Sequence, residues 1–168
     1  MIPTRRQREL HRSATHEAGH AVLGYVLGVR VERISIEQQG SSAGHVQARA
    51  FRHQRSAVYA LAGYAAEQVL LDVPAVWQLH QHEGGDLLDA LGILKEWHGR
   101  SITVDDAEFL EAWARSQAAT RTASRRIRAV ARVLLRDRVV EGRDRVRRVL
   151  EGRGLTWYTK TLKAIHGR

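Results

Sequence analysis

The sequence contains no cysteine, and this absence excludes both a disulfide framework and a thiolate metal site. Any metal ion must therefore be held by histidine and carboxylate side chains. Only 2 of the 168 residues are proline and 43% are hydrophobic, which is typical of a globular, helix-rich protein rather than a disordered one. A chain of this length is expected to form a single domain, residues 1–168, with its own hydrophobic core.

Long apolar runs are also missing from the chain. No stretch approaches the roughly 20 residues that a membrane span needs, and no apolar signal-peptide core follows the charged N-terminus. We therefore expect a cytoplasmic protein without a membrane span. No G-x-x-x-x-G-K-[ST] phosphate loop is present either, so the chain carries no recognisable ATPase of its own.

Positive charge is concentrated in the C-terminal part of the chain. The formal net charge is +9, and residues 119–168 carry 15 lysines and arginines against 4 acidic residues. Such asymmetry can mark a surface for nucleic acid or another acidic partner, but arginine is also a common helix former on solvated surfaces. We favour the solvated surface, so nucleic acid is not the expected partner.

Hydrophobic periodicity predicts a mainly α (α+β) fold. The expected strands are 29–36, with Ile34 and Ile36 facing the core, and 45–51, which returns to form a hairpin or small sheet. Asp86 is expected to cap a helix after a loop over 77–85. The expected helices are 4–27, 54–71, 86–97, one from 103 or 105 through 113, 120–140, 142–151 and 156–165, and the basic helical C-terminal part is about 103–168.

The residues His16-Glu17-Ala18-Gly19-His20 match the pattern H-E-x-x-H within the first predicted helix. Two histidines four residues apart project from one face of a helix and can bind one zinc ion. Glu17 then lies beside the metal, where its carboxylate can accept a proton from a zinc-bound water. This predicts a metalloendopeptidase. Gly19, unfavourable by about 1 kcal/mol relative to alanine in a helix, indicates close approach of another backbone or chain.

A catalytic zinc site needs a third protein ligand and an open fourth position. The residues alone leave six candidates open: Glu67, Asp72, His80, His82, Glu83 and Asp86. Glu67 lies on a predicted helix and is either a ligand or a residue that orients one, while Asp86 follows two glycines at a predicted helix start. His45 is interpreted as a strand residue, and His80 and His82 as residues that could rim the site. The isolated histidines are interpreted as surface or hydrogen-bonded residues: His11, His53, His98 and His166.

Four segments, in the same order, resemble the zinc peptidase domain of the FtsH family of membrane-anchored AAA proteases. They are residues 16–22 (HEAGHAV), 34–46 (ISIEQQGSSAGHV), 61–67 (LAGYAAE) and 84–90 (GGDLLDA), and the resemblance spans most of 10–165. It implies a helical, zincin-like peptidase domain with a small β-sheet beside the active-site helix. It also implies Zn²⁺ on His16, His20 and Asp86, with Glu17 as the catalytic base.

The chain departs from the family pattern in ways that bear on its substrates. Gly85 stands where an asparagine usually precedes the aspartate, Ala62 replaces a glycine, and the membrane helices and ATPase module are absent. A free-standing domain is expected to cleave peptides or unfolded protein segments; further partners to consider are a separate ATPase and other copies of the chain.

The alternative is a non-catalytic zinc-containing regulatory or binding module whose basic C-terminal helices contact nucleic acid or an acidic partner. Glu17 favours the enzyme, because a purely structural zinc site needs no base.

Overall fold

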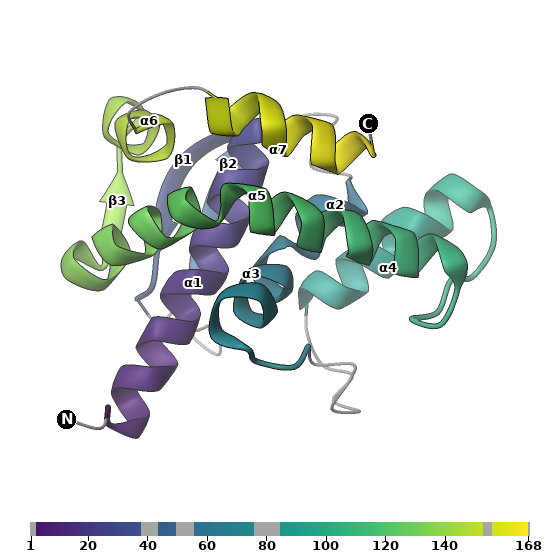
Figure 1. The fold of residues 1–168 in the computed structure, drawn as a ribbon, viewed down its shortest axis with the longest axis horizontal. Helices are drawn as coiled ribbons and strands as arrows, with labels where there is room; N and C mark the ends of the chain where they lie inside the picture. The colour runs from purple at the N-terminus through teal and green to yellow at the C-terminus, as the bar shows by residue number, and fades with distance from the viewer. Residues whose placement is uncertain (1–2, 38–43, 50–55, 76–84, 153–155, 168) are drawn as a thin grey trace.

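The computed structural model describes residues 3–37, 44–49, 56–75, 85–152 and 156–167. This part of the chain is mainly helical with a small antiparallel sheet (Figure 1), so the predicted fold class is confirmed. No helix among these residues is long and apolar enough to cross a membrane. The elements in chain order are α1 (Arg5–Val26), β1 (Arg30–Ser35), β2 (His45–Arg49), α2 (Ala57–Ala60), α3 (Ala62–Leu71), α4 (Gly85–His98), α5 (Ala107–Asp137), β3 (Val139–Glu141), α6 (Arg143–Glu151) and α7 (Thr156–His166).

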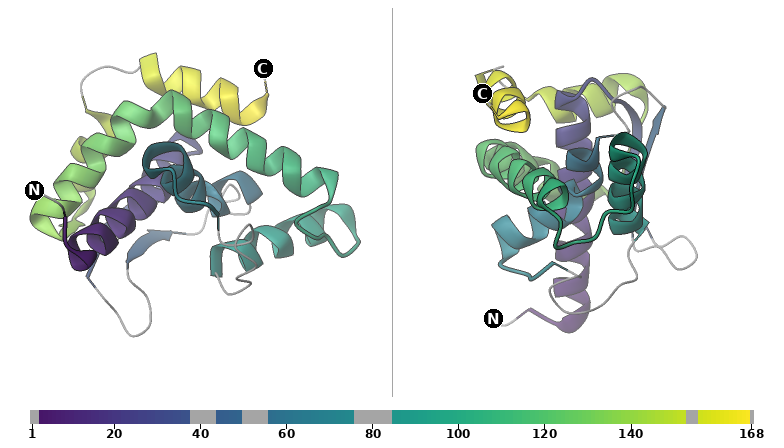
Figure 2. Two further views of the ribbon diagram at one scale, coloured as in Figure 1. Left: turned by 60° about the horizontal axis from the view of Figure 1, so that its bottom comes forward. Right: turned by 90° about the vertical axis from the view of Figure 1, so that its right-hand side faces the viewer.

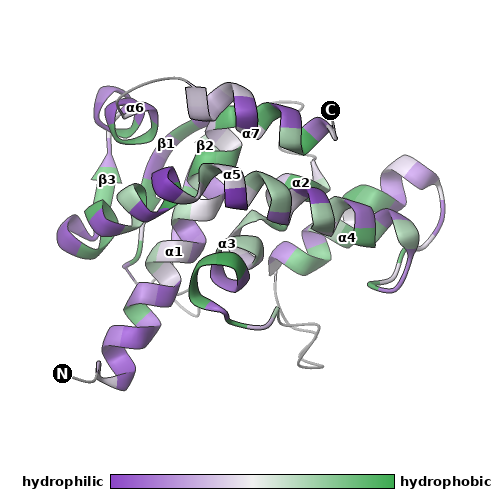
Figure 3. Ribbon diagram, viewed as in Figure 1, coloured by the Kyte–Doolittle hydropathy of each residue, from purple (hydrophilic) through white to green (hydrophobic). Residues whose placement is uncertain are grey.

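Helix α1 changes character along its length. Thr4 and Gln7 close its N-terminus with a capping box, in which each side chain accepts a hydrogen bond from the other residue's backbone N–H. The first turns are hydrophilic and exposed (Figure 3), whereas most residues from Ala14 onward are buried. A Cβ on Gly19 would lie 2.6 Å from the carbonyl oxygen of Ala62. The close backbone approach expected at Gly19 is therefore confirmed.

The buried half of α1 lies at the centre of the molecule. Helix α5 crosses it and also packs against α3 and α7, while β1 packs against α1 from another side (Figures 1 and 2). Phe109, Ile127 and Leu134 of α5 are fully buried in the resulting core. Each such side chain contributes roughly 1.5–3 kcal/mol of burial free energy, so α1 is firmly held.

The three strands run in the order β2-β1-β3, and both pairs are antiparallel. Ile34 pairs with Val46 on one side and Val140 on the other, and the β1–β2 register shifts between Val31 and Arg33. Ile34 and Ile36 are buried, as predicted. The third strand was not predicted, because three residues are too few to establish an alternating pattern.

Several predicted helix boundaries were wrong. The helix expected over 54–71 is divided at Leu61 into α2 and α3, whereas its predicted end at 71 is confirmed: α3 ends at Leu71, and Asp72 takes a left-handed conformation (φ 57°). The helices expected through 113 and over 120–140 form the single helix α5, which ends at Asp137, because the residues between them (114–119, ARSQAA) include no helix breaker. The helical C-terminal part begins at Ala107 and is interrupted by β3.

Candidate metal centre

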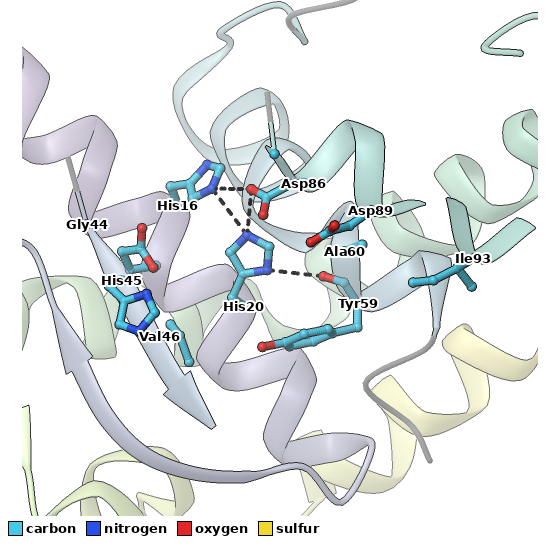
Figure 4. A pocket seen from close by; sticks show the side chains of 12 residues that line it. His16, His20, Gly44, His45, Val46, Tyr59, Ala60, Asp86, Asp89 and Ile93 are labelled. Carbon is cyan, nitrogen blue, oxygen red and sulfur yellow. Dashed lines mark hydrogen bonds and ion pairs between the residues drawn. The ribbon is translucent and has the colours of Figure 1, made fainter. Parts of the chain in front are cut away.

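Three side chains from two helices converge beside the buried half of α1 (Figure 4). His16 and His20 lie on successive turns of α1, and Asp86 lies in the first turn of α4. Asp86 Oδ2 is 2.9 Å from His16 Nε2 and 3.1 Å from His20 Nε2, and the two Nε2 atoms are 3.2 Å apart. The predicted capping role of Asp86 is wrong, because α4 already includes Gly85; the carboxylate is directed at the histidines instead.

The remaining ring nitrogens have partners that accept hydrogen bonds. His20 Nδ1 donates to the backbone carbonyl of Tyr59 at 3.1 Å, and His16 Nδ1 donates to Glu67 Oε1 at 2.7 Å. In neutral imidazoles this leaves both Nε2 atoms with lone pairs that face the Asp86 carboxylate. The two Nε2 lone pairs and the Asp86 carboxylate point at one another and would repel without a positive charge between them. The group could therefore hold a metal ion.

The ionisation of the site agrees with this requirement for positive charge. Burial would lower the pKa of His16, but hydrogen bonds to Asp86 and Glu67 raise it to about 10. Burial would raise the pKa of Asp86, but the charge of His20 and hydrogen bonds from both histidines lower it well below its usual range. In the metal-free protein, a proton on His16 therefore supplies the charge that the carboxylates demand.

Glu67 lies behind His16, on the side away from Asp86. It is 5% exposed, and its second carboxylate oxygen accepts a hydrogen bond from Arg12 Nε at 2.6 Å. This arrangement fits the orienting role that was one of its two predicted alternatives. Gly63, one turn earlier on α3, leaves room for the imidazole, since a Cβ at Gly63 would overlap the ring of His16.

Glu17 is 8% exposed and lies at the junction of two cavities. The first, of about 620 Å³, contains the two histidines and Asp86; the second, of about 1040 Å³, extends along the exposed half of α1. Burial raises the pKa of the Glu17 carboxyl, although the charges of His20 and His16 oppose the shift. A raised pKa makes this carboxylate a stronger proton acceptor than an exposed glutamate.

Other residues of the first cavity were not predicted as site residues. His45 begins β2, as expected of a strand residue, but it also lines the cavity, and its charge acts on the pKa of Glu17. Tyr59 lies edge-on to His20, with ring centroids 5.5 Å apart. Asp89 and Ile93 follow Asp86 at helical spacing, which could have indicated that all three share one face of α4.

The other predicted candidates do not extend this centre within the described residues. Asp72 is exposed at the C-terminal cap of α3 and lines neither cavity. His11, His98 and His166 likewise line neither cavity. His80, His82, Glu83 and His53 lie outside the described residues.

No family model and no curated protein matches the chain. The site is therefore defined by its own chemistry: two imidazole nitrogens and one carboxylate oxygen converge from α1 and α4, and a buried glutamate follows the first histidine. This group could hold a metal ion.

Proposed function

We propose that the protein is a zinc-dependent metalloendopeptidase that hydrolyses peptide bonds in peptides or unfolded protein segments. The convergence of His16 Nε2, His20 Nε2 and Asp86 Oδ2 carries this proposal. Tetrahedral zinc with bonds of about 2.0–2.2 Å separates its ligand atoms by about 3.3–3.6 Å, close to the 2.9–3.2 Å in this structure. Three protein ligands leave the fourth position for catalysis.

Zinc in this site would supply Lewis acidity, which lowers the pKa of a water molecule and polarises a scissile carbonyl. The protein supplies the orientation and the proton transfer. Glu67 and the Tyr59 carbonyl hold the two imidazoles so that their Nε2 atoms face Asp86. Glu17 accepts the proton of the attacking water and delivers it to the amine nitrogen as the carbon–nitrogen bond breaks.

The proposal is tested by digestion of unfolded casein. We expect the zinc-loaded protein to cleave it, a chelator to stop cleavage, and added zinc to restore it. A protein that contains about one zinc per chain and still leaves casein and short peptides intact would contradict the proposal.

A second candidate is the non-catalytic zinc-containing module, and one surface favours it. Arg121, Arg125, Arg128 and Arg132 are exposed and recur at helical spacing along α5. Residues 112–136 contain seven arginines and no aspartate or glutamate. We prefer the enzyme because Glu17 is buried and lines the same cavity as His16, His20 and Asp86, and a purely structural site gives no reason to keep a buried acid there.

A further inference from the structure

We propose that the first cavity binds a positively charged side chain of the substrate, lysine or arginine, and that Asp89 recognises its charge. This inference rests on the proposed peptidase function and specifies the substrates that the same site would prefer.

One face of α4 lines the first cavity. Asp86, Asp89 and Ile93 are spaced by three and four residues, so they share one face of the helix, and all three line the first cavity. Figure 4 shows them following one another away from the histidines. A substrate side chain that occupies this cavity would therefore pass along Asp89 and Ile93.

The two carboxylates on this face differ in their partners. Asp86 is engaged by both histidines, and its charge is balanced within the candidate metal centre. Asp89 is exposed, and it makes no hydrogen bond or ion pair with any other residue that the structure describes. Its negative charge is therefore available to a ligand.

The rest of the cavity suits a long side chain with a charged end. Ile93, Ala60, Val46 and the ring of Tyr59 provide apolar wall, and the volume of about 620 Å³ is ample for a lysine or arginine. Both side chains combine an apolar stem with a cationic head, and they bury the stem where the head can reach a polar partner. A glutamate would instead meet the negative charge of Asp89.

The second cavity offers no comparable attraction for a cation. Apart from His16 and Glu17, which line both cavities, its charged residues are three arginines and three glutamates: Arg6, Arg12, Arg138, Glu9, Glu37 and Glu67. The two sides of Glu17 therefore differ in charge, and a basic substrate residue is expected on the α4 side.

Matched peptides test the proposal. Quenched fluorescent peptides would have an acetylated N-terminus and a single lysine, which is replaced by norleucine or by glutamate in two otherwise identical peptides. We expect the zinc-loaded protein to show kcat/KM at least about fivefold higher for the lysine peptide than for the norleucine peptide, and lower still for the glutamate peptide. Mass spectrometry of the products would give the place of the lysine relative to the cleaved bond.

Two substitutions of Asp89 identify the residue responsible. Asp89→Asn should remove the preference for lysine over norleucine, and Asp89→Lys should reverse it in favour of glutamate. Asp105→Lys is the matched control, because Asp105 is also exposed and lines neither cavity. It makes the same change in net charge and should keep the preference of the parent.

A binding measurement separates this inference from the proposed function. Fluorescence anisotropy with zinc-loaded Glu17→Gln should show tighter binding of the lysine peptide than of the other two. Preferential binding without any cleavage by the parent would contradict the peptidase and support the cation site. Cleavage of all three peptides at equal rates, or an unchanged preference in Asp89→Lys, would overturn the assignment to Asp89 and a basic side chain.

Discussion

Glu17 is the residue at which a catalytic and a structural metal site predict different outcomes. Glu17→Gln preserves the shape of the side chain but cannot accept the proton of the attacking water. We expect the variant to keep its zinc and its fold while casein cleavage falls by about 10² or more. Metal content and turnover are the two measurements, and Glu9→Gln is a control on an exposed glutamate of the same helix. Cleavage at the rate of the parent would favour the non-catalytic module.

The third ligand is tested by comparing the two acidic residues that contact His16. Asp86→Ala should abolish zinc retention, because Asp86 Oδ2 faces both Nε2 atoms. Glu67→Ala should weaken zinc affinity by only about 10–100-fold, because Glu67 touches the far nitrogen of His16 and orients the ring. Zinc titration of both variants decides the question. A fully loaded Asp86→Ala and a metal-free Glu67→Ala would reverse the assignment.

Local sequence was sufficient to predict some site residues and insufficient for others. His16 and His20 lie four residues apart in one helix, so their spacing alone predicted that they share a face, and their Nε2 atoms lie 3.2 Å apart in the structure. The choice between Asp86 and Glu67 depended on how α3 and α4 pack, which periodicity does not encode. The carbonyl of Tyr59 that orients His20 has no side-chain pattern at all, and therefore could not be predicted.

Helix α3 packs so closely on α1 that one added methyl group should disturb the candidate metal centre. In Gly63→Ala the new Cβ would overlap the His16 ring, so we expect weaker zinc binding although alanine is the better helix former. Gly92→Ala in α4 is the control, since a Cβ there meets nothing within 4 Å; it should leave zinc affinity unchanged and stabilise the fold by about 0.5–1 kcal/mol. Zinc titration and thermal unfolding measure the two effects, and parental zinc affinity in Gly63→Ala would contradict this packing.

The last turn of α1 is joined to the C-terminal helices through Tyr25. Its hydroxyl donates to Glu151 Oε1 at 2.8 Å, Arg147 Nε lies 2.6 Å from the same oxygen, and Trp157 stacks on the ring. Burial and then the hydrogen bond to Glu151 raise the pKa of Tyr25 to about 12. The folded protein therefore holds this proton more tightly than the unfolded chain, whose tyrosines titrate near 10.

The resulting stability should be fully present below pH 10 and lost as the pH rises through about 12. Urea unfolding at pH 9 and pH 11.5 checks this, with Tyr25→Phe as the comparison because it removes only the hydroxyl. The parent should lose more unfolding free energy between the two pH values than the variant does. Equal losses would show that Tyr25 titrates alike in the folded and unfolded states.

A long element with a regular apolar pattern was easier to predict than a short one. The 22 residues of α1 repeat their apolar positions over many turns, whereas β3 has only three residues. The break between α2 and α3 falls at Leu61 inside an Ala-rich stretch without proline, so no residue type predicted it. A break of this kind depends on packing rather than on local preference.

The exposed arginines of α5 provide a test of the second candidate function. We expect weak, sequence-independent binding to a short DNA duplex, with most of it lost by about 200 mM salt, because each neutralised phosphate releases counterions. Replacing Arg121, Arg125, Arg128 and Arg132 by glutamine should reduce the slope of log affinity against log salt by up to about 3–4. Tight binding that survives 200 mM salt would place the binding module ahead of the peptidase.

The candidate metal centre also has a topological consequence. His20 and Asp86 are separated by 66 positions in the chain, so a bound ion would close a long loop between the central helix α1 and α4. In a chain without cysteine, this is a cross-link of the kind that a disulfide provides elsewhere. Unlike a disulfide it is reversible: because the ion binds the folded state, each tenfold rise in free metal above the dissociation constant adds about 1.4 kcal/mol to the free energy of unfolding.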